Sequence, residues 1–283
     1  MTSTRLKLLL IVLSFLMIFS RMNSLYAETE QKTDHEKKTG TVTGQVMIKD
    51  EDGKPLAFGQ IMFYDVMSGP PPAPHKYERT PDISKTINAE GKFTVELLEG
   101  RYYIGAVRRI SGERFGPPQE GDYIFRSLDD NGKPKEYLVQ AGKVLDIGTF
   151  TEAVPLKAED IAQHNIATAI EGYILDVDGK PVEDAVVVAF VKPTIGGRPL
   201  FVSDRSGKDG KYILRVTEGT YYLRARNSFA AGPPEPGQIV GYYGEGTPAP
   251  VTVEQCEIRK GIDFRVILFP GRGPFSGTTQ ENQ

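Results

Sequence analysis

The chain has 283 residues, of which 39% are hydrophobic and 25% charged, and its formal net charge is −3. The apolar fraction is too high for a disordered chain and too low for a protein with many membrane spans. The small net charge gives no strong field for nucleic acid, so we expect no such partner. The 30 Gly and 20 Pro, nearly 18% of all residues, favour a turn-rich β protein.

Residues 1–27 predict a secretory signal peptide. Arg5 and Lys7 precede an apolar run over residues 8–19, and the segment ends at the small residue Ala27. As a helix the run rises about 18 Å, short of the roughly 30 Å of a hydrocarbon core, so we expect no stable membrane span after cleavage. Because residues 1–27 hold three basic and no acidic residues, the remainder carries a net charge of −6. We expect an exported protein, periplasmic or extracellular.

The main feature of the remaining chain is an internal repeat. Residues 90–106 (EGKFTVELLEGRYYIGA) and 209–225 (DGKYILRVTEGTYYLRA) are identical at seven of 17 positions. The offset of about 120 residues makes each copy the size of a domain. We predict two domains, a connecting linker and two polar ends: a disordered spacer at 28–40, domain 1 at 41–150, the linker at 151–167, domain 2 at 168–270 and a flexible tail at 271–283.

Each copy shows the pattern of β-strands. Apolar and polar residues alternate over 92–97 and 211–216, which predicts strands with one buried face. The apolar run 185–191 (AVVVAFV) predicts a central strand, and the linker holds one short helix starting near Pro155. Strand-like runs recur with turn signals between them, so we predict an all-β chain with an antiparallel sandwich in each copy. Six residues are expected to form the structural turns: Gly53, Pro55, Gly100, Gly179, Pro181 and Gly219.

A family resemblance rests on two motifs of the second copy. The first comprises Gly172, Ile174, Asp176, Gly179, Pro181, Val182, Ala185 and Val187. The second comprises Asp209, Gly210, Tyr212, Leu214, Gly219, Tyr221, Leu223 and Ala225. Together they resemble the carboxypeptidase regulatory-like domain, a seven-stranded transthyretin-like (prealbumin-like) sandwich. The first copy departs from the motif at residues 58–60 and carries a Pro-rich insert at 68–81. The resemblance implies two tandem, non-catalytic modules of an exported protein, of the kind found beside enzymes or in surface and adhesive assemblies.

Few residues suit catalysis or metal binding. His75 and Glu78 match the HxxE zinc motif of carboxypeptidases by spacing, but they lie in the Pro-rich insert, which favours a solvated loop. His35 and His164 lie in the spacer and the linker, where solvated side chains are expected. Cys256 is the single cysteine of the chain, so an intrachain disulfide is excluded. We expect its thiol to be buried or half-buried, and a disulfide between two chains stays open. We expect no catalytic residue, no metal and no cofactor.

The candidate binding residues are Tyr and Arg side chains, the types enriched at binding hot spots. If Tyr221, Leu223 and Ala225 face the core, their neighbours on the same strand face outward. Alternatively, that stripe is only a solvated sheet face or a contact between the domains. Tyr103 is the matching residue of the first copy, and two further tyrosines follow in a predicted loop. The candidate set is Tyr222, Arg224, Arg226, Tyr103, Tyr242 and Tyr243.

The sequence favours an exported, non-catalytic binding or structural module of the periplasm or cell surface, acting through protein–protein interaction. The alternative is an ancillary carbohydrate-binding protein, because starch-binding domains are similar sandwiches. A third reading is an iron-dependent dioxygenase-type enzyme, whose iron is held by two Tyr and two His. The expected partner is a protein or glycan of the cell envelope, and the oligomeric state stays open.

Overall fold

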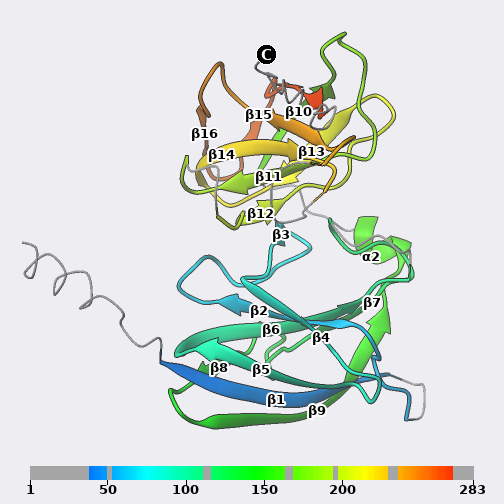
Figure 1. The fold of residues 1–283 in the computed structure, drawn as a ribbon, viewed down its shortest axis with the longest axis vertical. Coiled ribbons are helices and arrows are strands. Elements are labelled where there is room, and N and C mark those ends of the chain that lie inside the picture. Colours follow the sequence, from blue (N-terminus) through cyan, green and yellow to red (C-terminus); the bar gives the residue numbers. More distant parts are fainter. Residues whose placement is uncertain are drawn as a thin grey trace, which may run out of the picture. The chain divides into compact units, whose positions relative to one another are not determined.

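The fold is almost entirely β (Figure 1). The computed structural model describes residues 38–49, 53–110, 116–162, 168–193, 197–228 and 235–269. The predicted signal peptide, nearly all of the spacer and the predicted tail lie outside these ranges. The predicted fold class, all-β with sandwich domains, is confirmed by the strands and their pairing.

The strands follow one another in two series. The first series is β1 (Thr39–Ile48), β2 (Gln60–Asp65), β3 (Glu78–Arg79), β4 (Ile83–Thr86), β5 (Lys92–Leu98), β6 (Gly100–Arg108), β7 (Tyr123–Arg126), β8 (Glu136–Val139) and β9 (Val144–Pro155). After the short helix α2 (Ala158–Ala162) the second series is β10 (Ala169–Leu175), β11 (Val186–Phe190), β12 (Phe201–Val202), β13 (Lys211–Arg215), β14 (Gly219–Arg226), β15 (Ile239–Tyr242), β16 (Pro250–Val253), β17 (Ile258–Arg259), β18 (Phe264–Arg265) and β19 (Ile267–Leu268).

The two series share one pairing plan. In the first, the strand order is β4-β2-β6-β7-β9-β1-β5, with β8 also on β6. In the second, one sheet runs β19-β15-β14-β11-β12-β3, with β16 on β14, and the other runs β13-β10-β17, with β18 on β10. The ladders are antiparallel except where the first strand of each copy meets the last ones: β1 pairs with β9, and β10 with β17 and β18, in parallel. The predicted antiparallel sandwiches therefore also contain parallel ladders at these places.

Each series encloses its own hydrophobic core. The first core contains Phe63, Phe93 and Tyr102, and the second contains Phe201, Tyr212 and Phe264. Burying an aliphatic or aromatic side chain of this size stabilises a fold by about 1.5–3 kcal/mol. The contacts nevertheless group Gly40–Gln283 as one compact unit. The division into domains at 41–150 and 168–270 therefore stays a prediction.

The predicted alternation is present in the strands. Along β5, the side chains of Phe93, Val95 and Leu97 are buried, and the residues between them are exposed. All five residues of β11 are buried, as expected for a central strand, and β11 lies between β12 and β14. The short helix predicted near Pro155 is α2, although β9 first continues to Pro155, inside the predicted linker.

The predicted turn residues divide into two kinds. Gly53 (φ 70°) and Gly179 (φ 80°) adopt the left-handed conformation that glycine tolerates, and Pro55 and Pro181 follow them in isolated β-bridges to Met47 and Leu175. Gly219 has φ 152°, which side-chain-bearing residues rarely adopt. Gly100, its counterpart in the first copy, has no positive φ. The expectation that Gly100 needs glycine's conformational freedom was therefore wrong.

The Pro-rich insert 68–81 is ordered, contrary to the expectation of a solvated loop. Its strand β3 pairs antiparallel with β12 of the second copy, and the backbone N–H of Thr80 donates to the carbonyl of Leu200 at 3.0 Å. Tyr77 belongs to the second core, where its ring lies 5.1 Å from the ring of Phe201. The first copy thus contributes both a strand and an aromatic side chain to the second sandwich.

Arg79 holds the insert in this path. Its guanidinium is buried and donates to the carbonyls of Gly69 (3.1 Å), Pro70 (2.5 Å) and Asp65 (2.6 Å), and it pairs with the carboxylate of Asp82 at 2.9 Å. A buried charge is costly unless it is paired and hydrogen-bonded, and these contacts satisfy both Nη atoms, while the buried Nε has no hydrogen-bond partner among the described residues. Arg79 therefore acts as a structural centre of the insert.

Candidate functional site

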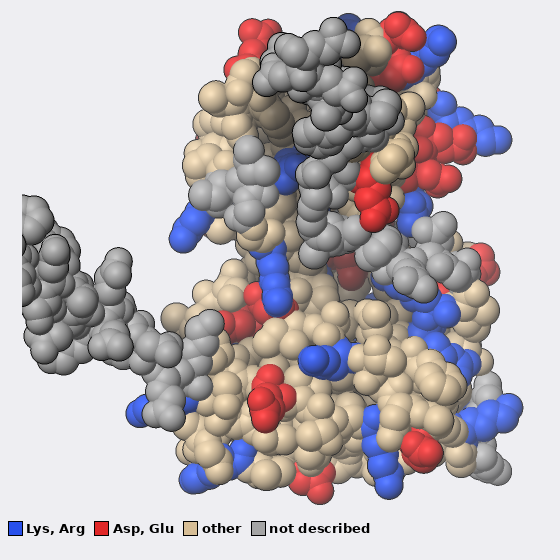
Figure 2. Space-filling model, in the orientation of Figure 1, with Lys and Arg blue, Asp and Glu red and all other residues tan. Residues whose placement is uncertain are grey.

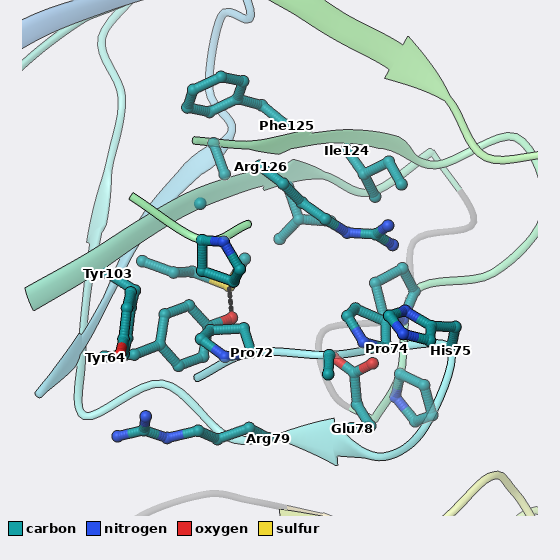
Figure 3. A pocket seen from close by; sticks show the side chains of 18 of the residues that line it. Tyr64, Pro72, Pro74, His75, Glu78, Arg79, Tyr103, Ile124, Phe125 and Arg126 are labelled. Atoms are coloured by element: carbon teal, nitrogen blue, oxygen red, sulfur yellow. Dashed lines mark hydrogen bonds between the residues drawn. The ribbon is translucent and has the colours of Figure 1, made fainter. Parts of the chain in front are cut away.

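A cavity of about 530 Å³ lies over the outer face of the sheet formed by β2, β6 and β7 (Figure 3). Met62 and Tyr64 of β2 and Tyr103 of β6 form its floor together with β7. The ordered insert closes one side with its prolines and with Glu78 of β3. Asp204 and Arg215 of the second copy also line the cavity. The volume is in the range of small-molecule sites.

Glu78 and Arg126 are two charged groups of the cavity that act on each other electrostatically; the side chain of Glu78 is half-buried and that of Arg126 is exposed. Within the described ranges, neither side chain makes a hydrogen bond or an ion pair. In Figure 3, Glu78 points from β3 into the space that Arg126 enters from β7. Burial raises the pKa of Glu78 to about 7; the positive charge of Arg126 opposes this rise, and the negative charge of Asp204 adds to it.

The other guanidinium groups near Glu78 are already paired. Arg215 forms a bidentate ion pair with Asp204, with N···O distances of 2.7 and 3.0 Å. Arg109 donates to the carbonyl of Gly116 at 2.6 Å and lies 3.8 Å from the carboxylate of Asp122. These charges are neutralised by the protein itself. Arg126 differs from these groups because it is exposed and forms no ion pair within the described residues, although its charge acts on Glu78.

Two tyrosines lie at the other end of the cavity (Figure 3). The Tyr64 hydroxyl donates to Sδ of Met62 at 3.6 Å, and burial raises the pKa of Tyr64. The Tyr103 hydroxyl donates to Glu136 at 3.2 Å, and burial and this carboxylate raise the pKa of Tyr103. The sequence placed Tyr103 on an exposed face. The face is correct, but the side chain is buried because the insert covers that part of the sheet.

His75 lies at the rim of the cavity and is exposed. Both members of its HxxE spacing therefore line one cavity, which the sequence did not indicate. No group of three or more His, Cys, Asp or Glu side chains in the described part of the chain is arranged to hold a metal ion. His35 and His164 lie outside the described residues.

A second candidate site lies on the outer face of β14. Tyr222, Arg224 and Arg226 lie opposite the core-facing residues of the strand, as the alternation predicted. In β15, Tyr242 pairs directly with Arg224 and shares its face. We call Tyr222, Arg224, Arg226 and Tyr242 the Tyr–Arg face. The structure thus brings together four of the six predicted binding residues.

The Tyr–Arg face is half-buried rather than open. Beside it, Val186, Val188 and Phe190 of β11 form a buried apolar cluster on the same side of the sheet, and Tyr222 packs against this cluster. Burial lowers the pKa of both Arg224 and Arg226. This burial disfavours the alternative of a fully solvated sheet face, and a binding role for these residues stays a prediction.

Two further expectations about solvent exposure were wrong: Tyr242 and Tyr243 were expected in an exposed loop, and Cys256 was expected to be at least half-buried. Tyr242 is the final residue of β15 and not part of a loop, and Tyr243 packs against the second core, 6.3 Å from the ring of Phe264. Cys256, expected to be buried or half-buried, is exposed. Its backbone has φ 62°, and its N–H donates to the Thr168 hydroxyl at 2.9 Å. The turn there orients the thiol outward.

Charge on the visible surface is mixed. In Figure 2 the Lys and Arg side chains are interspersed with Asp and Glu and separated by uncharged surface.

Among the described residues, no helix has the length and apolar character needed to cross a membrane.

No protein-family model matches the chain, and neither does any curated protein. Solved structures that it resembles include the TIE protein of Bacillus anthracis (11% identity, TM-score 0.26), a streptococcal ancillary pilin (16%, 0.24) and a minor pilin of Streptococcus agalactiae (14%, 0.23). The matches cover 81%, 83% and 83% of this chain. They cover 34%, 64% and 99% of the other chains, so this chain spans only part of the first two.

Proposed function

We propose that the chain is an exported, non-catalytic module of the periplasm or cell surface that binds a protein of the cell envelope. Its two domains, at 41–150 and 168–270, are proposed to be of the carboxypeptidase regulatory-like type. The signal-like segment 1–27 supports export. The repeated pairing plan supports two related domains.

The observation that carries the binding role is the Tyr–Arg face. Tyr and Arg are the residues most enriched at the centres of protein interfaces, where partly desolvated guanidinium groups form strong hydrogen bonds. Here two strands place both types on one side of the sheet, and burial already lowers the pKa of Arg224 and Arg226. A partner that covers this face would remove the remaining water from the guanidinium groups of Arg224 and Arg226, which the fold already buries in part.

Two of the charged groups around the cavity serve the fold. Arg79 donates to backbone carbonyls of the insert, and Arg215 forms an ion pair with Asp204. This use of charged side chains to fix a framework is consistent with a binding or structural module.

The test is the double variant Tyr222→Ser with Arg224→Ser. The matched control is Tyr173→Ser with Arg265→Ser, which alters an exposed Tyr and an exposed Arg of the other sheet. Cross-linking in the native envelope, followed by pull-down, compares the partners, and a melting curve compares stability. We expect the first variant alone to lose its partners while its melting temperature is retained. Unchanged partners would contradict the proposal, and an accompanying loss of stability would show an internal contact instead.

A second candidate function is binding of a glycan of the envelope. Tyr222 lies two residues from Arg224 on the same face of β14, and Tyr242 lies opposite Arg224 on β15. In this arrangement the rings can stack on sugars and the guanidinium can donate to hydroxyls. Depletion of the protein by insoluble polysaccharides, lost in Tyr222→Ala, would favour this candidate over a protein partner. Absence of depletion by all polysaccharides would exclude it.

A further inference from the structure

We propose that the cavity beside β3 binds an organic carboxylate, which Arg126 holds through its guanidinium and which Glu78, in its protonated form, contacts as a hydrogen-bond donor. This site is separate from the Tyr–Arg face and does not depend on the function proposed for it. The carboxylate belongs to a free organic acid or to the end of a peptide, and the chemistry at the site is the same for both.

The first argument is the availability of the Arg126 guanidinium. Arg79, Arg109 and Arg215 each form an ion pair with a carboxylate of the protein, whereas Arg126 is exposed and forms no ion pair among the described residues. Arg126 reaches from β7 into the cavity, where its fork of N–H groups matches the two oxygens of a carboxylate (Figure 3). A bound carboxylate would replace the water around this guanidinium.

The second argument is the position of Glu78. Its carboxyl group accepts no hydrogen bond from the described part of the protein, yet it faces the cavity. With its pKa raised to about 7 by burial, it is largely protonated at mildly acidic pH, and it then offers one O–H donor. In that form it adds no negative charge that would repel an anion. The titratable and charged groups that line the cavity with Glu78, or act on it electrostatically, are Tyr64, His75, Arg79, Tyr103, Arg109, Arg126, Asp160, Asp204 and Arg215.

The third argument is the shape and lining of the cavity. Beside the two charged groups its walls are apolar, with Met62, Val107 and Ile124 from the sheet and several prolines from the surrounding loops. The volume of about 530 Å³ accommodates an organic body as well as its acid group. An aromatic acid therefore fits better than a small inorganic anion.

The pH dependence separates this proposal from binding of an amine. If protonated Glu78 is required, affinity for a carboxylate falls as pH rises, by about tenfold between pH 6 and pH 8, as follows from a pKa of about 7. An amine held by ionised Glu78 would bind more tightly as pH rises. The sign of the change therefore decides between the two.

The experiment titrates the full mature protein with benzoate at pH 6 and pH 8, by NMR or calorimetry. We expect tighter binding at pH 6, loss of binding in Arg126→Gln, and binding without pH dependence in Glu78→Gln. Arg265→Gln removes an exposed Arg elsewhere and should bind like the unaltered protein. His75→Gln should keep the pH dependence, which separates Glu78 from the histidine at the rim.

Two further probes complete the test. Acetyl-phenylalanine, compared with its amide, reports whether a peptide end is accepted; if the acid binds and the amide does not, the carboxylate is the recognised group. Benzylamine reports the opposite charge. Binding of benzylamine that strengthens at pH 8, or binding of benzoate that survives Arg126→Gln, would overturn the proposal.

Discussion

The two copies share a pairing plan, but they differ in the connection that follows their second strand. In the second copy this connection joins β11 to β12 directly, whereas in the first it carries the insert with β3 before reaching β4. The insert leaves its own sheet, pairs with β12 and closes the cavity. The comparison teaches that the repeated residues specify the framework. The residues of the insert, which have no counterpart in the second copy, specify how the two copies join and where the proposed ligand site forms.

The largest expected effect of breaking this join is from Tyr77→Ala. Tyr77 is buried in the second core against Phe201, so truncation leaves a cavity there and lowers the free energy of unfolding by about 3–4 kcal/mol. Lys76→Ala, at the exposed neighbouring position, is the control and should change it by less than about 0.5 kcal/mol. Denaturant unfolding measures both. Equal effects would show that the insert contributes nothing to the second sandwich.

A pH dependence of stability is expected from Glu78. Burial raises its pKa in the folded chain from the ordinary 4.5 to about 7, so folding favours the protonated form. This contribution is full below about pH 4.5 and is lost as pH rises through about 7, because ionisation of the buried group opposes folding. Between pH 5 and pH 8 the unaltered protein should lose about 2 kcal/mol relative to Glu78→Gln. Parallel pH profiles of the two proteins would contradict this.

A smaller effect distinguishes the matched glycines of the two copies. Gly219→Val forces a β-branched residue to φ 152°, and its Cβ would lie 3.1 Å from the Tyr221 hydroxyl. Gly100 has no positive φ, and the nearest atom to an added Cβ is 3.5 Å away in Tyr102. We expect Gly219→Val to lower the free energy of unfolding by about 1–2 kcal/mol more than Gly100→Val does. Thermal melts that rank the two variants in the opposite order would be inconsistent with this difference.

The framework could be predicted because strand alternation records which face is buried. The pattern of Phe93, Val95 and Leu97 against their polar neighbours has one explanation, a half-buried strand. The path of the insert had no such signal. Prolines remove both periodicity and backbone donors, and β12, which β3 joins, lies about 120 residues away in the sequence.

The candidate sites were predictable to different degrees. The Tyr–Arg face followed from alternation on β14, although its partial burial and the arrival of Tyr242 from β15 depend on tertiary packing. The cavity combines Glu78 and Arg126 from strands separated by more than 40 residues. Alternation along β7 indicates only that Arg126 faces away from Phe125. Nothing local indicates that the insert will bring Glu78 to the cavity that Arg126 lines.

The most direct test of the join is amide hydrogen exchange over the insert. The N–H of Thr80 donates to Leu200, and β3 pairs with β12, so exchange at these amides requires opening of the second sandwich. We predict that a peptide covering residues 76–80 exchanges as slowly as one covering β12, and that Tyr77→Ala accelerates both together. Exchange of residues 76–80 at the rate of an unprotected chain, with β12 still slow, would contradict the account.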